Sequence, residues 1–267
     1  MDWLLNLPIA WLAIAILAAS YAVAGLIYFV VRRLAVGERI QSFKAISAGM
    51  LSPLAVVFAL LVGFLAAQVW SDADRAGTAV NREASALRAA VLLSDQFPGD
   101  AQRRLRELIR QHITTAAADE WPAMARHGAN LTLVPHALAD ALRVALSLEP
   151  RGAGQALAQR ELVASIQSAL DARRQRIVLS GSSVNVVKWG ALLVQAALIL
   201  LTIAMVHCDN PLGNRIILAV FATGAAAAVL LIAAHSRPFS GALSIRPALL
   251  LQVMPEGGEP SRGAGEP

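Results

Sequence analysis

Few side chains in this 267-residue sequence are arranged in a way that would support chemistry. His207-Cys208-Asp209 groups three potential metal ligands, and the adjacent carboxylates Asp119-Glu120 would suit acid–base catalysis if they faced one another. We interpret the first group as a polar hairpin loop, because no second ligand cluster accompanies it. We interpret the carboxylates as surface charge, because consecutive residues of a helix point in different directions. With no phosphate-binding glycine loop and no nucleophile elbow, the sequence predicts no catalytic residue, no metal site, no cofactor and no enzyme.

A different kind of function is suggested by three apolar residues. Val56, Leu60 and Phe64 recur at four-residue intervals, so they share one stripe of a helix. The stripe has two interpretations. It faces lipid or a protein core, or it lies at a symmetry axis, where rings of apolar side chains form a constriction that gates by dewetting. The spacing alone favours the first interpretation.

The stripe belongs to one of four long segments that contain no Asp, Glu, Lys or Arg. These segments are residues 8–31, 45–70, 189–206 and 216–234. Each is at or near the ~20 residues that a helix needs to cross about 30 Å of hydrocarbon. Charged residues make up 15% of the chain, against about 25% in soluble domains. We therefore expect an all-α integral membrane protein with four transmembrane helices, two before and two after a helical extramembrane domain.

The expected organisation has four parts. Residues 1–70 contain the first two transmembrane helices, 71–186 the helical extramembrane domain, 187–241 the last two transmembrane helices, and 242–267 a largely disordered tail rich in Gly, Glu and Pro.

Within this plan, the second transmembrane helix is expected to begin near Pro53, since Pro is tolerated in a first turn. Apolar residues from Ala76 to Val91 at spacings of three and four predict that it continues into the domain, with Glu83 among the charges on its polar face. Further helices are expected over residues 100–119, 135–148 and 155–179, and the stretch 121–134 is expected to be irregular.

Cationic flanks predict the orientation. Nine Lys and Arg residues, Arg173 and Arg176 among them, adjoin the spans on the side of the middle domain and both termini, against five on the other side. Because Lys and Arg mark cytoplasmic flanks, this domain and both termini are expected to be cytoplasmic. Residues 71–188 mix 15 basic with 12 acidic residues, so the expected partner is the lipid bilayer and not nucleic acid.

Several motifs resemble those of a known family. The run from Ser52-Pro53-Leu54 through Gly63-Phe64, followed by Asp72 to Arg75, resembles the second segment of the bestrophin ion channels. Two further motifs are similar to a bacterial set of uncharacterised bestrophin-like membrane proteins, whose four-span layout matches nearly the whole chain. They are Glu120-Trp121-Pro122 and Arg237-Pro238-Phe239-Ser240-Gly241.

The resemblance implies a homo-oligomer, pentameric in bestrophins, whose second helices surround a path for inorganic ions in the bacterial inner membrane. It places Val56, Leu60 and Phe64 at the apolar neck of that path and assigns structural roles to the shared motif residues. The chain departs from the bestrophin pattern after Phe239, where Ser240-Gly241-Ala242 replaces the acidic cluster that binds calcium. Calcium gating is therefore not expected, and the sign of the ion stays open.

Two other classes of function compete with the channel. One is a non-conducting membrane scaffold whose amphipathic helices dock a partner, in keeping with a near-neutral helical domain and spans that offer no polar route. The other is an enzyme acting on lipid or peptide, for which the sequence offers no catalytic constellation.

Overall fold

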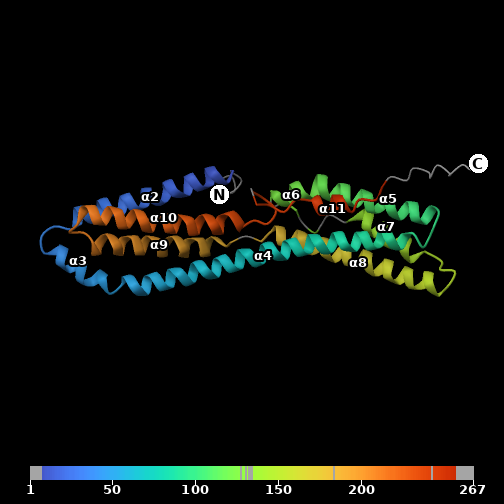
Figure 1. Ribbon diagram of the computed structural model, residues 1–267, viewed down its shortest axis with the longest axis horizontal. Coiled ribbons are helices and arrows are strands. Elements are labelled where there is room, and N and C mark those ends of the chain that lie inside the picture. The colour runs from blue at the N-terminus through green and yellow to red at the C-terminus, as the bar shows by residue number, and fades with distance from the viewer. Residues whose placement is uncertain are drawn as a thin grey trace, which may run out of the picture. The chain divides into compact units, whose positions relative to one another are not determined.

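The computed structural model describes residues 8–126, 128–129, 131, 135–182, 184–241 and 243–256. Every regular element in this part of the chain is helical, as the sequence predicts. The elements, drawn in Figure 1, are α2 (Ile9–Leu34), α3 (Arg39–Ala48), α4 (Leu51–Ser94), α5 (Asp100–Thr115), the π-helix η1 (Ala116–Glu120), α6 (Trp121–Ala125), α7 (His136–Leu146), α8 (Ala153–Ser180), α9 (Val186–Val206), α10 (Pro211–His235) and α11 (Ala248–Gln252). Four of them, α2, α4, α9 and α10, are long and apolar enough to cross a membrane.

The chain divides into two compact units. The first unit contains the residues up to Ala73, Ser182–Arg237 and Gly241–Leu243. The second contains Asp74–Gly181, Pro238–Ser240 and the chain from Ser244 onward. Neither unit is a single stretch of sequence.

The first unit is a bundle of apolar helices. Helix α10 packs against α2 and α9, and α3 packs against α9. The polar side chains of these helices bond within the unit: the hydroxyls of Tyr21 and Thr223 lie 2.8 Å apart, and Gln195 donates to the carbonyl of Leu54 at 2.9 Å. In hydrocarbon such internal bonds satisfy groups that have no water to bind.

Helix α4 is a single element of 44 residues, about 66 Å long at 1.5 Å per residue. It begins at Leu51, so Pro53 lies in its first turn, where a missing N–H is harmless. Gly77 does not end it. The sequence prediction that the second span runs on into the charged domain is confirmed.

The second unit has its own apolar core. Helix α7 packs against α5 and α8, while α11 packs against α5 and α6 against α8. The predicted apolar face of α5 is buried in this core, through Leu105, Leu108, Ile109 and Ile113. The later half of α4 contributes Ala76, Val80, Ala84 and Leu87 to the same core.

Two details differ from expectation. The helix expected over 100–119 is α5 followed by η1, and α6 continues it, so the start of the stretch 121–134 is helical and not irregular. Thr115, Ala116, Glu120 and Trp121, at the junctions of these elements, all have αR backbone angles, so the chain stays helical there. Residues 132–134, Ala242 and the end of the tail from residue 257 lie outside the described residues.

Candidate functional site

The stripe on α4 is exposed in the single chain. Val56 is 56%, Leu60 57% and Phe64 72% accessible. The other side of the same helix is covered, with Leu65 and Val69 packed among Leu192 and Ile232. Three large apolar side chains therefore point out of the protomer, and in a membrane either lipid or another protein chain covers them.

Two further motif residues of the first unit lie on or near this surface. Pro53 and Gly63 are both exposed on α4. A Cβ added at Gly63 would meet no atom within 4 Å, so nothing inside one protomer requires glycine there. Close approach of a second helix is the usual reason for a small residue on a membrane helix.

A buried ion-pair network occupies the second unit, and it was missed by sequence reasoning. The guanidinium of Arg176 on α8 has no exposed surface. Its Nε donates to Glu83 Oε2 at 2.7 Å and its Nη2 to Glu120 Oε2 at 2.8 Å. Arg173 Nη2 lies 2.6 Å from Glu120 Oε1, and His112 Nε2 lies 2.9 Å from Glu83 Oε1. Four helical elements, α4, α5, η1 and α8, are joined by these contacts.

The charges of the network are matched. Two guanidinium groups face two carboxylates, which is the arrangement that makes buried charge tolerable. Burial opposes ionisation of Arg176 and of Glu83, yet the pairing outweighs it: the pKa of Arg176 is raised by the Glu83 and Glu120 charges, and the pKa of Glu83 is lowered by Arg176 and by the hydrogen bond from His112. Both groups are therefore charged at neutral pH.

Trp121 joins the network to the segment that follows the last span. Its ring lies 4.4 Å from the guanidinium carbon of Arg176, a cation–π distance, and packs edge-on against Phe239 at 6.0 Å. Its indole N–H donates to the carbonyl of Ile245 at 2.9 Å. The Glu-Trp-Pro and Arg-Pro-Phe-Ser-Gly motifs thus meet around one indole ring, although Trp121 and Phe239 are 118 positions apart in the sequence.

The other motif residues shape the backbone around this ring. Pro122 lies in the first turn of α6. Pro238 is buried, and its carbonyl accepts from Ile245 N at 2.8 Å, closing the turn after α10. Gly241 has φ of 84°, a left-handed conformation that favours glycine. Arg237 is half-buried.

The three potential metal ligands His207-Cys208-Asp209 make structural contacts instead. Asp209 pairs with Lys44 at 2.6 Å, and this hydrogen bond and charge raise the pKa of Lys44 and lower that of Asp209. His207 Nδ1 lies 3.1 Å from the carbonyl of Ile203. Within the described residues, no group of three or more His, Cys, Asp or Glu side chains could hold a metal ion.

Comparison with known proteins identifies the family to which this chain belongs. A family model, the bestrophin-like domain, matches residues 18–250, which is most of the chain. The chain belongs to the bestrophin-like family.

Solved structures agree with the fold of this bestrophin-like protein. A bacterial bestrophin homolog from Klebsiella pneumoniae is 13% identical, with a TM-score of 0.64 over 90% of this chain and 95% of that one. A single-substitution variant of the Klebsiella homolog gives 13% identity and a TM-score of 0.66 over 91% and 96%. At this identity the likeness shows the fold alone. Among curated proteins, no match was found.

With these findings, the predicted fold class is confirmed for the bestrophin-like chain: an all-α integral membrane protein with a bestrophin fold and four apolar spans.

The interpretation of Glu120 as surface charge is wrong, although Asp119 beside it is exposed. Glu83 is buried and does not lie on a polar face, and Arg173 and Arg176 are inside the unit and not on its surface. The network escaped detection because its partners are far apart in sequence, 93 residues for Glu83 and Arg176.

Proposed function

We propose that this protein forms a homo-oligomeric ion channel, pentameric like the bestrophins that it resembles, in the bacterial inner membrane. In this assembly the α4 helices surround a central axis, and Val56, Leu60 and Phe64 form successive apolar rings that make a neck. Each protomer of this channel has the domain division expected from the sequence. Its spans lie in residues 1–70 and 187–241, and its helical domain in residues 71–186.

The observation that carries the proposal is the exposed apolar stripe on α4. A side chain such as Phe64, 72% accessible in one protomer, needs a covering surface in the membrane. Neighbouring copies around an axis would supply one while leaving a narrow apolar passage. Such a passage controls ions by wetting and dewetting, without a charged filter.

The proposed orientation keeps the middle domain and both termini in the cytoplasm. Because Arg173 and Arg176 are buried, they no longer count as flanking cations, and the number of flanking Lys and Arg residues changes from nine against five to seven against five. The majority still lies on the side of the middle domain, which favours a cytoplasmic position for it.

A non-conducting scaffold remains the second candidate, and one observation favours it. The polar groups of the spans are used inside the protomer, as in Tyr21 with Thr223 and Gln195 with the Leu54 carbonyl. The stripe would then face acyl chains, and the amphipathic second unit would dock a partner protein.

Crosslinking between copies tests which surface covers the stripe. In a Cys208→Ser background, we expect Leu60→Cys to give crosslinked dimers with a short bifunctional thiol reagent, and native mass spectrometry to give five times the 28.1 kDa protomer. The matched control is Leu26→Cys on α2, which is 64% accessible but off α4. A monomeric mass, or equal crosslinking at both positions, would count against the channel and favour the scaffold.

Thiol labelling of intact cells tests the orientation. In the same Cys208→Ser background, a cysteine at exposed Glu38, in the connection before α3, should react with a membrane-impermeant maleimide added outside. A cysteine at exposed Glu149, in the connection before α8, should react only after the membrane is opened. The reverse pattern would place the middle domain outside the cytoplasm.

A further inference from the structure

The last turn of α2 carries two consecutive exposed arginines, Arg32 and Arg33. At 26 residues, α2 is about 39 Å long, which exceeds the ~30 Å thickness of the hydrocarbon layer. In Figure 1 this end of α2 lies with α3 and the turn between α9 and α10 at one end of the first unit. The two guanidinium groups therefore lie at the depth of the lipid headgroups.

Each arginine lies over the aromatic ring one turn before it. The guanidinium carbon of Arg33 is 4.8 Å from the centre of the Phe29 ring, and that of Arg32 is 5.9 Å from the centre of the Tyr28 ring. Both are cation–π distances. Arg32 Nη1 also donates to the Tyr28 hydroxyl at 3.0 Å. Because side chains of a helix lean toward its N-terminus, both cations are directed back along α2 toward the membrane.

Positive charge is in excess at this end of the unit. Residues 32–50 and 207–215 contain five cations and two carboxylates: Arg32, Arg33, Arg39, Lys44 and Arg215 against Glu38 and Asp209. Asp209 is already paired with Lys44 at 2.6 Å. Among the described residues, Glu38 forms no ion pair with either arginine of α2. The two guanidinium groups therefore need an anion from outside the chain.

The side chains below Arg33 select the kind of anion. Phe29 and Val30 precede Arg33 by four and three residues, so all three share one face of α2. Phe29 and Val30 are exposed large apolar residues. Stacking on Phe29 occupies one flat side of the guanidinium and leaves the N–H groups at its edge free. A ligand that contacts this whole face has an acidic head and an apolar chain.

We propose that this face of α2 binds an anionic phospholipid, whose phosphate meets the Arg33 guanidinium while an acyl chain lies along Phe29 and Val30. Arginine matches phosphate because its planar fork donates two parallel hydrogen bonds. Clusters of cations at the membrane surface attract anionic lipids, and Arg32 adds a second charge beside the first. This lipid site goes beyond the proposed channel, and it requires neither conduction nor a particular oligomer.

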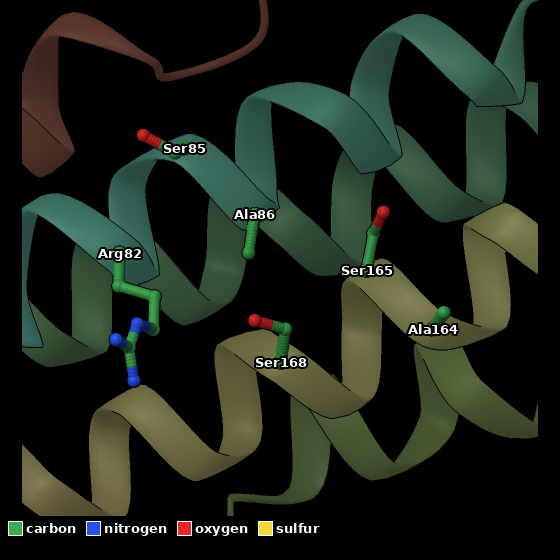
Figure 2. Close-up of a pocket in the computed structure, with 6 residues that line it drawn as sticks. All are labelled: Arg82, Ser85, Ala86, Ala164, Ser165 and Ser168. Atoms are coloured by element: carbon green, nitrogen blue, oxygen red, sulfur yellow. The ribbon is translucent and has the colours of Figure 1, made fainter.

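An exposed arginine elsewhere in the chain supplies the matched control. Arg82 borders a groove between α4 and α8 in the second unit (Figure 2). In the figure the Ser165 hydroxyl points away from the Arg82 guanidinium, so these polar groups do not converge on one ligand. The rest of the lining is alanine and serine. Arg82 therefore carries the same charge as Arg33 without the ring and the apolar face.

Phosphatidylglycerol is the probe for this site. The full-length protein in detergent is titrated with phosphatidylglycerol or phosphatidylcholine, and native mass spectrometry measures the lipid bound per protomer. We expect saturable binding of phosphatidylglycerol, tighter than that of phosphatidylcholine. Arg33→Gln should weaken it about fivefold, the effect of one cation near an anionic lipid. Phe29→Leu keeps the charge and should weaken it about threefold through loss of the cation–π contact. Arg82→Gln should leave it unchanged.

Three results would overturn the proposal. They are equal binding of the two lipids, equal losses in Arg33→Gln and Arg82→Gln, and wild-type binding in Phe29→Leu. Displacement of the lipid by inorganic phosphate at equal concentration would also overturn it, because it would reveal a site for free phosphate. All three residues are exposed, so thermal midpoints close to wild type are expected and verify folding. Current without a lipid preference would end only the lipid site, whereas phosphatidylglycerol binding to a silent protein would end only the channel.

Discussion

Leu60→Ala and Phe64→Ala are expected to increase the ionic current through the protein in reconstituted bilayers. Each change shortens an apolar side chain that is more than half exposed on α4 and would widen one ring of the proposed neck. A wider neck holds water more readily, which lowers the barrier to a hydrated ion. Lowering that barrier by about 1.4 kcal/mol raises the rate tenfold, so we expect increases on the order of tenfold, larger in the double variant.

The control for this experiment is Leu26→Ala, which shortens an equally exposed apolar residue on α2 and should leave the current at the wild-type level. Stripe variants that match wild type, in an assembly of verified mass, would remove Leu60 and Phe64 from the permeation path. Silence of the wild type and all variants would favour the scaffold.

Arg176→Met is expected to give the largest loss of stability. The change leaves the buried carboxylate of Glu83 without its guanidinium partner, and that of Glu120 with Arg173 alone. Removing one partner of a buried pair destabilises by about 3–5 kcal/mol, because the remaining charge stays desolvated. The measurement is the thermal midpoint of the detergent-solubilised protein, followed by size-exclusion chromatography. Arg174→Met is the matched control, since Arg174 is exposed on the same helix and should change stability by less than about 0.5 kcal/mol.

This loss should depend on pH. In the wild type the pKa of Glu83 is lowered, so its stabilising contribution is complete above the unfolded pKa of about 4.3 and disappears as pH falls through the folded value. Without Arg176, burial raises the pKa of Glu83, and protonation then relieves the unpaired charge. The gap between Arg176→Met and wild type should therefore be widest near neutral pH and shrink in acid. A gap that is constant with pH would mean that lost packing, and not charge, explains the effect.

Much of the helical plan follows from local pattern. Residues 53–70 carry no charge, and Ala76, Val80, Ala84 and Leu87 then keep one apolar face, so the continuity of α4 could be predicted. The same reasoning identified the buried face of α5. Such patterns are local, because a helix repeats its face every three or four residues.

The network could not be read in the same way, because the sequence does not say which charges meet. One signal was present. Glu83 falls three residues after Val80 and four before Leu87, on the buried row of α4, and Arg173 follows Ala169 by four on the buried row of α8. A charge on an apolar row indicates a buried pair, but its partner lies on another helix.

The stripe stays a prediction for a related reason. Exposure of Val56, Leu60 and Phe64 in one protomer is compatible with lipid and with other copies, and only the assembly distinguishes them. Sequence therefore supplied the candidate residues, while their role depends on contacts between chains.

The contacts of Trp121 impose an order on biosynthesis. Phe239 and Ile245, which hold its indole ring, and Pro255, whose carbonyl accepts from Arg110, are all translated after the fourth apolar helix. Most of the charged unit leaves the ribosome earlier and must wait, with one side of its core open, until α10 has been synthesised. A nascent chain stalled before Phe239 would present that open side to chaperones and proteases, so completion of the last span becomes a checkpoint for the maturation of the whole protomer.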